Sequence, residues 1–312
     1  MLHAFQIEQG RLAPLDERAD IHDADWLDLY AGTDEERANV EQLYKHALPE
    51  SDDIEEIEAT SRAYEDQAGL HLRSLFLHRV DGNPRNSTVA FTLNSKRLLS
   101  VHERDIPAFR LLRMRGRRDT GWSSDATGLL LSVFEIKIDD LADLLEEVYA
   151  GLDQVSTTVL EDETADMEEA IDELARYEDI NGKVRLCLMD TQRALTYLQR
   201  RGRLDEETSR RVRDLLQDTE SLLPHNSFVF DKINFLMDAA LGFINIEQNQ
   251  IIKIFSIAAV VFLPPTLVAS IYGMNFEYMP ELGWHLGYPM AIGLMIAAGI
   301  APYLYFKRKG WL

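Results

Sequence analysis

The chain has 312 residues, of which 46% are hydrophobic, and a formal net charge of −21 at pH 7. This excess of acid argues against a nucleic-acid-binding protein, which needs a basic face, and it favours partners that are cations. The single cysteine, Cys187, excludes a disulfide framework within one chain. It lies in the apolar stripe of KVRLCLMD, so we expect a buried residue there.

Residues 1–124 predict a mixed α/β domain. The stretch HAFQIEQGRLAPL alternates around a Gln-Gly turn, as a hairpin does, and DADWLDLY predicts a strand. Thr33 and Glu36 form a capping box at the start of a helix that we expect to reach about Ala47. Further strands are predicted in LHLRSLFLHRV, STVAFTLN and RLLSVHE, and a helix in PAFRLLRMRGRR. The N-terminus lacks the pattern of a cleaved signal peptide, so we expect this domain to be cytoplasmic.

Residues 125–250 predict long cytoplasmic helices and a stalk. Apolar side chains recur at three- and four-residue spacing from Leu130 to Val159, which indicates one amphipathic helix. A second helix opens in EDETADMEEAIDELARYED and ends at Gly202. A third begins near Asp205 and meets no turn signal before Gly273, although Pro224 predicts a kink. At 1.5 Å per residue a helix of roughly 65 residues is about 100 Å long. This length is far greater than the ~30 Å thickness of a membrane's hydrocarbon core, so most of such a helix would protrude from a membrane.

Acidic residues crowd the opening of the second helix, in the segment 161–179. A solvated helix face is the ordinary explanation of such a run, and a surface that raises the local cation concentration is the alternative. The histidines His22, His46, His71, His78 and His102 show no metal-ligand spacing, so a structural zinc site is poorly supported. The sequence carries no nucleotide-binding or nucleophile motif, so we expect no enzymatic activity and no process driven by nucleotide hydrolysis.

Two runs near the C-terminus, 254–272 and 287–306, contain no charged residue. Each is close to the ~20 residues that cross a ~30 Å hydrocarbon core. They include the prolines Pro264, Pro265 and Pro302, which membrane helices tolerate better than soluble ones. We therefore expect transmembrane helices at 251–272 and 287–306, joined by an outer loop, 273–286, rather than two buried helices of a soluble domain.

The charges that flank these runs predict their orientation. The basic residues on one side are Lys253, Lys307, Arg308 and Lys309, the last three in the tail 307–312. The connecting loop carries Glu277 and Glu281 and no lysine or arginine. Because basic flanks stay in the cytoplasm, both termini are expected there and the loop is expected outside.

One face of the first span carries a stripe that begins near Asp238 and would suit a pore. Its residues are Asn245, Asn249, Ile252, Phe255, Ala259, Leu263 and Thr266, followed by Asn275 beyond the helix. The stripe is polar at both ends and apolar in the middle, where a constriction can gate by dewetting. Amide oxygens can accept hydrogen bonds from the waters of Mg²⁺, which sheds them reluctantly. One helix pair cannot enclose a water path, so a conducting unit must be an oligomer. Ordinary polar residues at the inner interface remain the alternative reading of Asn245 and Asn249.

The sequence YGMNFEYMPEL, after PPTLVASI and before a second span that ends in KRKGWL, resembles the CorA family of magnesium transporters along the whole chain. The resemblance implies an α+β membrane protein: an N-terminal cytoplasmic α/β domain, long stalk helices and two C-terminal transmembrane helices, assembled as a funnel-shaped homopentamer. It implies a passive Mg²⁺ influx channel of the bacterial cytoplasmic (inner) membrane. Such a channel would be gated by cytoplasmic Mg²⁺, would also pass Co²⁺ and Ni²⁺, and would need no organic cofactor.

The resemblance also implies roles for individual residues. Gly273, Met274 and Asn275 would form the selectivity filter, an outer ring that receives hydrated Mg²⁺, with Tyr272 supporting the turn. A left-handed backbone at Gly273 would let the chain leave the pore helix. Glu277 and Glu281 would make the mouth electronegative.

Inside the pore, the resemblance places Asn249 and Thr266 where the stripe places them independently. Ile252, Phe255 and Leu263 stand where relatives have Met or Leu at the hydrophobic constriction. Asp214, and with it Asp238, are the residues we expect to bind regulatory Mg²⁺ between subunits.

Two alternatives stay open. The first is a proton-coupled or otherwise active carrier of another divalent ion such as Zn²⁺, although the MPEL sequence after Asn275 favours magnesium. The second is an interaction scaffold that is merely anchored in the lipid bilayer. It predicts no functional cost for conservative changes in the 245–275 stripe.

Overall fold

The computed structural model describes residues 1–16, 20–44, 47–48, 62–118, 125–162, 165–275 and 277–311. These residues form two compact units, Met1–Met237 and Asp238–Leu312, and each is described by itself. The helix α6 (Glu206–Tyr272) contributes residues to both.

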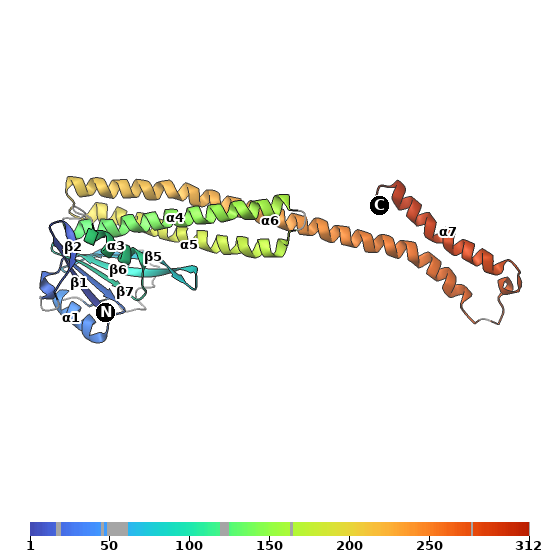
Figure 1. Ribbon diagram of the computed structural model, residues 1–312, viewed down its shortest axis with the longest axis horizontal. Coiled ribbons are helices and arrows are strands. Elements are labelled where there is room, and N and C mark those ends of the chain that lie inside the picture. Colours follow the sequence, from blue (N-terminus) through green and yellow to red (C-terminus); the bar gives the residue numbers. More distant parts are fainter. Residues whose placement is uncertain are drawn as a thin grey trace. The chain divides into compact units, whose positions relative to one another are not determined.

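A seven-stranded sheet organises the first unit (Figure 1). The strands lie in the order β2 (Arg11–Pro14), β1 (Leu2–Glu8), β3 (Trp26–Tyr30), β7 (Leu98–His102), β6 (Asn83–Leu93), β5 (Leu70–Val80) and β4 (Ala63–Glu65). Neighbours are antiparallel except β3 and β7, which run parallel. The strands expected from the sequence are confirmed. The short strand β4 and the first residues of β6 were missed.

Two hairpins turn through pairs of residues with positive φ. Gln9 and Gly10 have φ of 50° and 74° between β1 and β2, and Asp81 and Gly82 have φ of 52° and 82° between β5 and β6. Positive φ at both central residues is the type I′ turn, whose twist matches that of the flanking strands. The expected Gln-Gly turn is therefore confirmed.

Helices cover both faces of the sheet, because alternate strand residues point to opposite sides. Trp26 and Leu98 belong to a buried cluster with α3 (Pro107–Arg118) and α4 (Ala126–Glu161). The residues that follow them, Leu27 and Leu99, belong to a second cluster with α1 (Asp34–Tyr44).

Aromatic rings fill the first of these clusters. The ring centroids of Phe76 and Phe91 in the sheet lie 5.9 to 6.5 Å from those of Phe109 in α3 and Phe134 in α4, in tilted pairs. Such pairs contribute about 0.5–1.5 kcal/mol each beyond their buried area. They fix α3 and α4 to the sheet.

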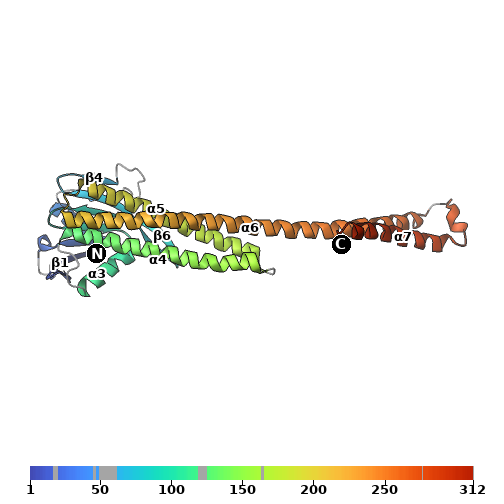
Figure 2. The same ribbon diagram turned by 90° about the horizontal axis from the view of Figure 1, so that it is seen from above.

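Three long helices of the first unit lie side by side: α4, α5 (Met167–Arg201) and the first part of α6 (Figures 1 and 2). Buried asparagines join two of them. Asn226 Nδ2 donates to the carbonyl of Asn181 at 2.8 Å, and Asn181 Nδ2 donates to the carbonyl of Asn226 at 3.1 Å. These bonds pair the side-chain NH₂ groups of both asparagines and fix how α5 and α6 align.

Side-chain caps set where the helices begin. The expected capping box of α1 is confirmed, since Glu36 accepts from the Thr33 backbone N–H at 2.9 Å. That bond, more than any other interaction, lowers the pKa of Glu36 to about 2. The second long helix begins later than expected, at Met167, because Asp166 caps it by accepting from the backbone N–H of residues 168 and 169.

The C-terminal ends of the helices can be compared with the ends predicted from the sequence. The first long helix runs on to Glu161, and the next one ends at Gly202 as expected. The helix α1 is described as far as Tyr44, and residues 45 and 46 of its expected end lie outside the described residues. The helix α6 continues through Pro224 without interruption, and a kink there stays a prediction.

Cys187 is 0% exposed, so the expectation of a buried thiol is confirmed. Burial raises the pKa of the thiol to about 12, which leaves about one thiolate in ten thousand at pH 8. We therefore expect iodoacetamide at pH 8 to leave the folded protein unlabelled and to label it fully in denaturant. Rapid labelling of the folded protein, followed by mass spectrometry, would contradict this burial.

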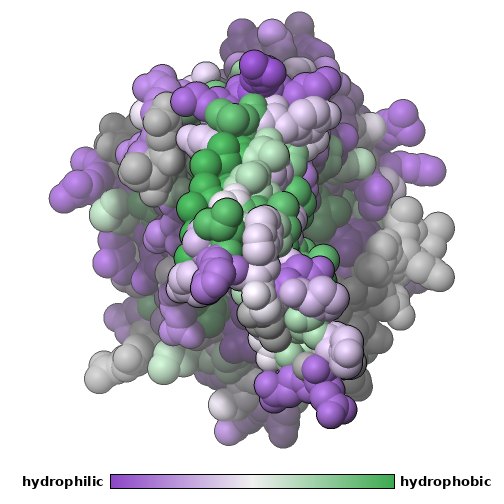
Figure 3. Space-filling view, turned by 90° about the vertical axis from the view of Figure 1, so that its right-hand side faces the viewer, coloured by the Kyte–Doolittle hydropathy of each residue, from purple (hydrophilic) through white to green (hydrophobic). Residues whose placement is uncertain are grey.

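The second unit consists of the end of α6, the short 3₁₀ helix η2 (Pro280–Gly283) and α7 (Gly287–Arg308). Within the described residues, α6 and α7 are the two helices that are long and apolar enough to cross a membrane. Their apolar side chains are largely exposed, with Phe255 71% and Phe262 70% accessible. Figure 3 shows a broad band of apolar side chains on one face. A surface of this kind requires hydrocarbon or a protein partner around it.

Candidate functional site

The stripe of the first span lies on the side of α6 that faces away from α7. The side that meets α7 includes Ile257, which is buried, and Val261 and Pro265, which are partly buried. A Cβ built on Gly299 of α7 would lie 3.3 Å from Pro265 Cγ, so the two helices pack closely there. At 3.6 residues per turn, the stripe is about half a turn from this contact. All its members are exposed: Asn245, Asn249, Ile252, Phe255, Ala259, Leu263 and Thr266.

The polar members of the stripe have acceptor oxygens to offer. Thr266 Oγ1 donates to the Phe262 carbonyl at 2.7 Å, and Asn245 Nδ2 donates to the Leu241 carbonyl at 2.9 Å. These bonds use donors and leave the hydroxyl lone pairs and the amide oxygen for other partners. Such oxygens can accept hydrogen bonds from the waters around a cation.

The chain leaves α6 at Gly273 by a tight turn. The Gly273 N–H donates to the Ala269 carbonyl at 2.9 Å, and the Met274 N–H donates to the Ile271 carbonyl at 3.3 Å. Gly273 is not among the residues with positive φ, so the expected left-handed conformation there is wrong. The space around it is nevertheless small, since a Cβ would lie 3.1 Å from the Ala269 oxygen. The turn leaves Asn275 exposed at the end of the helix.

The loop between the two spans presents its polar groups to solvent. Glu277 and Glu281 are both exposed, and residue 276 lies outside the described part. The loop returns to α7 through a close contact between Gly287 and the Glu281 carbonyl, which leaves no room for a Cβ at this glycine. The loop contains no lysine or arginine, so its two carboxylates give this end of the unit a negative charge.

The opposite end of the second unit is basic. Lys253 of α6 shares a cavity of about 500 Å³ with Tyr303 and Trp311, so the start of the first span and the end of the second lie together. The remaining basic residues occupy the last turn of α7 and the residue after it: Lys307, Arg308 and Lys309. This asymmetry of charge between the two ends is the one that the sequence indicated.

The structure does not bring the expected regulatory residues together within one chain. Asp214 and Asp238 are both exposed, and they lie far apart along α6. Among the described residues, no group of three His, Cys, Asp or Glu side chains could hold a metal ion.

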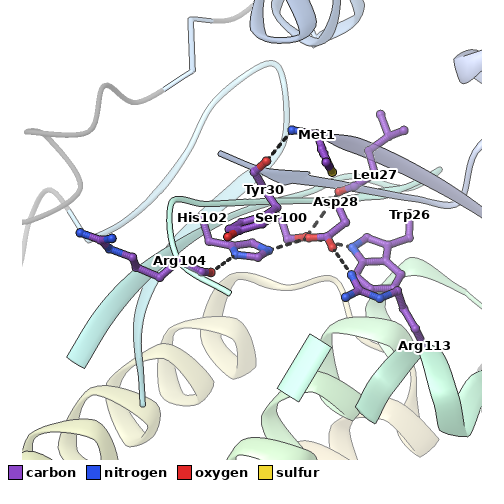
Figure 4. A network of polar contacts seen from close by, with 9 residues as sticks. All are labelled: Met1, Trp26, Leu27, Asp28, Tyr30, Ser100, His102, Arg104 and Arg113. Atoms are coloured by element: carbon purple, nitrogen blue, oxygen red, sulfur yellow. Dashed lines mark hydrogen bonds and ion pairs between the residues drawn. The ribbon is translucent and has the colours of Figure 1, made fainter. Parts of the chain in front are cut away.

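A buried ionic network lies on the face of the sheet that α3 covers, and the sequence analysis did not predict it (Figure 4). Asp28 of β3 is 0% exposed and accepts from Ser100 Oγ at 2.7 Å, His102 Nε2 at 2.9 Å and Arg113 Nη1 at 2.7 Å. The other ring nitrogen of His102 faces the Arg104 carbonyl at 2.6 Å, which ties the loop after β7 to the network. A carboxylate between two leucines in the strand WLDLY was the available signal.

Replacing Asp28 with alanine should lower stability by about 3–5 kcal/mol, because it leaves Arg113 and His102 without their buried acceptor. The exposed pair of Asp105 and Arg110 offers a control, for which Asp105→Ala should cost no more than about 1 kcal/mol. Thermal melting of the purified protein measures both. Equal shifts in the two variants would show that the network does not hold the sheet.

A second buried network anchors β5 to the long helices. Asp190 of α5 accepts from Arg62 Nη1 at 2.7 Å, from Ser74 Oγ at 2.7 Å and from the Leu75 N–H at 2.8 Å. Lys137 of α4 donates to Ser74 Oγ at 2.8 Å. Burial lowers the pKa of Lys137, and the charge of Asp190 opposes that shift. Both oxygens of Asp190 are thus engaged.

Known proteins resemble this chain over its whole length. A family model described as CorA-like Mg²⁺ transporter protein matches residues 22–308. The magnesium transport proteins CorA of Salmonella typhimurium (strain LT2) and of Escherichia coli (strain K12) are each 53% identical to the chain over 316 aligned residues, which cover 100% of both proteins in each pair.

The fold also has a solved counterpart. The complete structure of the CorA magnesium transporter from Methanocaldococcus jannaschii matches with a TM-score of 0.75 at 20% identity, over 100% of this chain and 98% of that one. At this identity the likeness shows the fold: an N-terminal α/β domain, a long helix and a C-terminal helix.

Proposed function

Since the chain belongs to the family of CorA-like Mg²⁺ transporter proteins, we propose that it is a passive Mg²⁺ influx channel in which α6 lines the pore. The observation that carries this proposal is the exposed stripe on the side of α6 away from α7. Thr266 lies within the expected span and Asn245 and Asn249 lie just before it, and a water path along this side of α6 would hydrate all three.

A single stripe cannot surround an ion, so we propose a homopentamer whose copies of α6 face one another. The rings of Phe255 and Leu263 would then make the middle of the path apolar and close it by dewetting. The rings of Asn275 and Thr266 would hold Mg²⁺ through its waters, which suits an ion that dehydrates reluctantly. Co²⁺ and Ni²⁺ would pass by the same contacts.

The charges at the two ends of the second unit set the proposed orientation. The basic end with Lys253, Lys307, Arg308 and Lys309 would face the cytoplasm, and the loop with Glu277 and Glu281 would face outward. Both termini are then cytoplasmic, and the two helices span the bacterial inner membrane. The outer carboxylates would raise the concentration of divalent cations at the mouth.

For regulation, we propose that cytoplasmic Mg²⁺ bound between subunits holds the closed state. The exposed carboxylates of α6, Asp214 and Asp238 among them, would repel one another in an assembly of five chains, and bound ions would offset that repulsion. An ion that prefers the closed state shifts the equilibrium by its differential affinity. Several weak sites would be needed to bias the equilibrium by a few kcal/mol.

We expect Asp214→Ala to weaken the protection from protease that millimolar Mg²⁺ gives to the cytoplasmic unit. Asp214→Lys should keep part of that protection without Mg²⁺, because a fixed positive charge replaces the ion. Asp172→Ala, at an exposed position of α5, is the control and should behave like the parent protein. Equal protection of the parent and Asp214→Ala would place the sensor elsewhere, and protection of neither would exclude this mechanism.

Rescue of growth tests the proposed function against its alternatives. Expression in bacteria that lack Mg²⁺ uptake should restore growth at low Mg²⁺. A carrier specific for another divalent ion such as Zn²⁺ would give no rescue. A membrane-anchored scaffold would give none either, and it would tolerate changes in the stripe.

A further inference from the structure

A cavity of about 750 Å³ in the first unit carries positive charge that the proposed transport does not use. It lies between the β5–β6 hairpin and α5, and it is lined by Arg85, Arg104 and Arg193. Within the described part of the chain, none of these three arginines has a carboxylate within ion-pair distance. Three such guanidinium groups around one cavity are unexpected in a chain of net charge −21. Their positive potential is directed into the cavity.

Among the described residues, Asp190 is the one carboxylate in the cavity wall, and it does not offset this charge. Asp190 already accepts from Arg62, Ser74 and the Leu75 N–H, and Lys137 lies 4.0 Å from its Oδ2. Asp190 is 5% exposed, so its negative charge is balanced by the buried groups that contact it. The part of the wall that the structure describes is therefore cationic.

His78 supplies a second, independent indication that a partner is missing. Its side chain is 9% exposed and lines the cavity, and its Nδ1 is buried with no hydrogen-bond partner among the described residues. Burial lowers the pKa of His78 and the charges of Arg104 and Arg85 lower it further, whereas a hydrogen bond between its ring and the Arg85 backbone opposes these effects. Buried polar atoms are nearly always paired, so an unpaired one beside a cavity indicates a ligand or a water.

The opposite wall is apolar. Leu186 and Met189 of α5 are 55% and 47% exposed and both face the cavity. The volume is within the ~300–1,000 Å³ of small-molecule sites, which combine apolar walls with a few convergent polar groups. The planar guanidinium of arginine can donate two parallel hydrogen bonds to two oxygens of a phosphate group, which makes arginine well suited to bind it. We propose that this cavity binds an organic polyphosphate anion of nucleotide size.

The proposal concerns binding alone and stands whether or not the transport proposal holds. Calorimetry on the full-length protein in detergent, with ATP as the probe and EDTA present, measures it directly. Arg104→Gln and Arg193→Gln should each weaken ATP binding about tenfold, because each removes a charge-assisted bond. Arg200→Gln is the matched control: it is exposed on the same side of α5, two turns further on, and lies outside the cavity. Unchanged melting temperatures would show that the variants fold.

Competitors distinguish the source of the phosphate. Adenosine and a short-chain phosphatidylglycerol should bind at least about tenfold more weakly than ATP, since neither carries several negative charges. Absence of ATP binding at millimolar concentration, or an equal loss in Arg200→Gln, would overturn the site. Pyrophosphate that binds as tightly as ATP would overturn the assignment to an organic anion, and displacement of ATP by the lipid would overturn the assignment to a soluble one.

Discussion

Alanine in place of Asn275 should abolish Mg²⁺ uptake while folding and assembly stay intact. The side chain is exposed at the end of α6, so its removal disturbs no packing. It would remove a ring of amide oxygens that accept from the waters of the entering ion. Loss of a single hydrogen bond of about 1.4 kcal/mol per ion weakens capture about tenfold, and a ring would lose several.

Uptake of Mg²⁺ by cells that express each variant at equal level measures this effect. His285→Ala, at an exposed position of the same loop, is the control and should transport normally. Normal Mg²⁺ uptake by Asn275→Ala would contradict the assignment of Asn275 to the selectivity filter.

Gly273 offers a second probe of the same turn. A Cβ at this position would meet the Ala269 carbonyl at 3.1 Å, so Gly273→Ala should displace the turn and reduce uptake. A Cβ at Gly283 meets nothing within 4 Å, so Gly283→Ala should be silent. Equal uptake by the two variants would contradict a role for the close approach at Gly273.

The second large effect concerns the apolar middle of the stripe. Leu263→Asn and Phe255→Gly should raise the leak of Mg²⁺ into cells already replete with it, because a polar or smaller ring wets more easily. Both side chains are exposed, at 65% and 71%, so the changes leave no cavity in a packed core.

Leu294→Asn on α7 is the matched control. Leu294 is 50% exposed on the second span, so its replacement introduces the same amide into the membrane outside the stripe. The leak should appear only with the α6 variants. A leak of equal size from Leu294→Asn would indicate general damage to the membrane part, and no leak from Leu263→Asn would argue against a hydrophobic gate at this level.

Local patterns predicted much of this molecule. The type I′ turn at Gln9 and Gly10 and the capping box of Thr33 and Glu36 depend on neighbouring residues, and both are confirmed. Long apolar periodicity likewise located α4 and the two candidate spans. The stripe was predictable because helical spacing alone decides which residues share a side.

Contacts between segments that are far apart in the chain could not be predicted from local sequence patterns. Asp28 meets Arg113 across 85 positions, and no local pattern shows that α3 would place a guanidinium there. The cavity lined by Arg85, Arg104 and Arg193 likewise gathers three separate elements. The backbone at Gly273 was mispredicted because a glycine after a helix is commonly left-handed, whereas here a closing hydrogen bond to Ala269 continues the turn.

Flux through the purified protein tests the central claim most directly. The protein is reconstituted into liposomes that contain a Mg²⁺-sensitive dye, and external Mg²⁺ is added with no other energy source. We predict a rise in internal Mg²⁺ that follows the imposed gradient and that Asn275→Ala abolishes. No rise above that of empty liposomes, or a rise that requires a proton gradient, would contradict a passive Mg²⁺ channel.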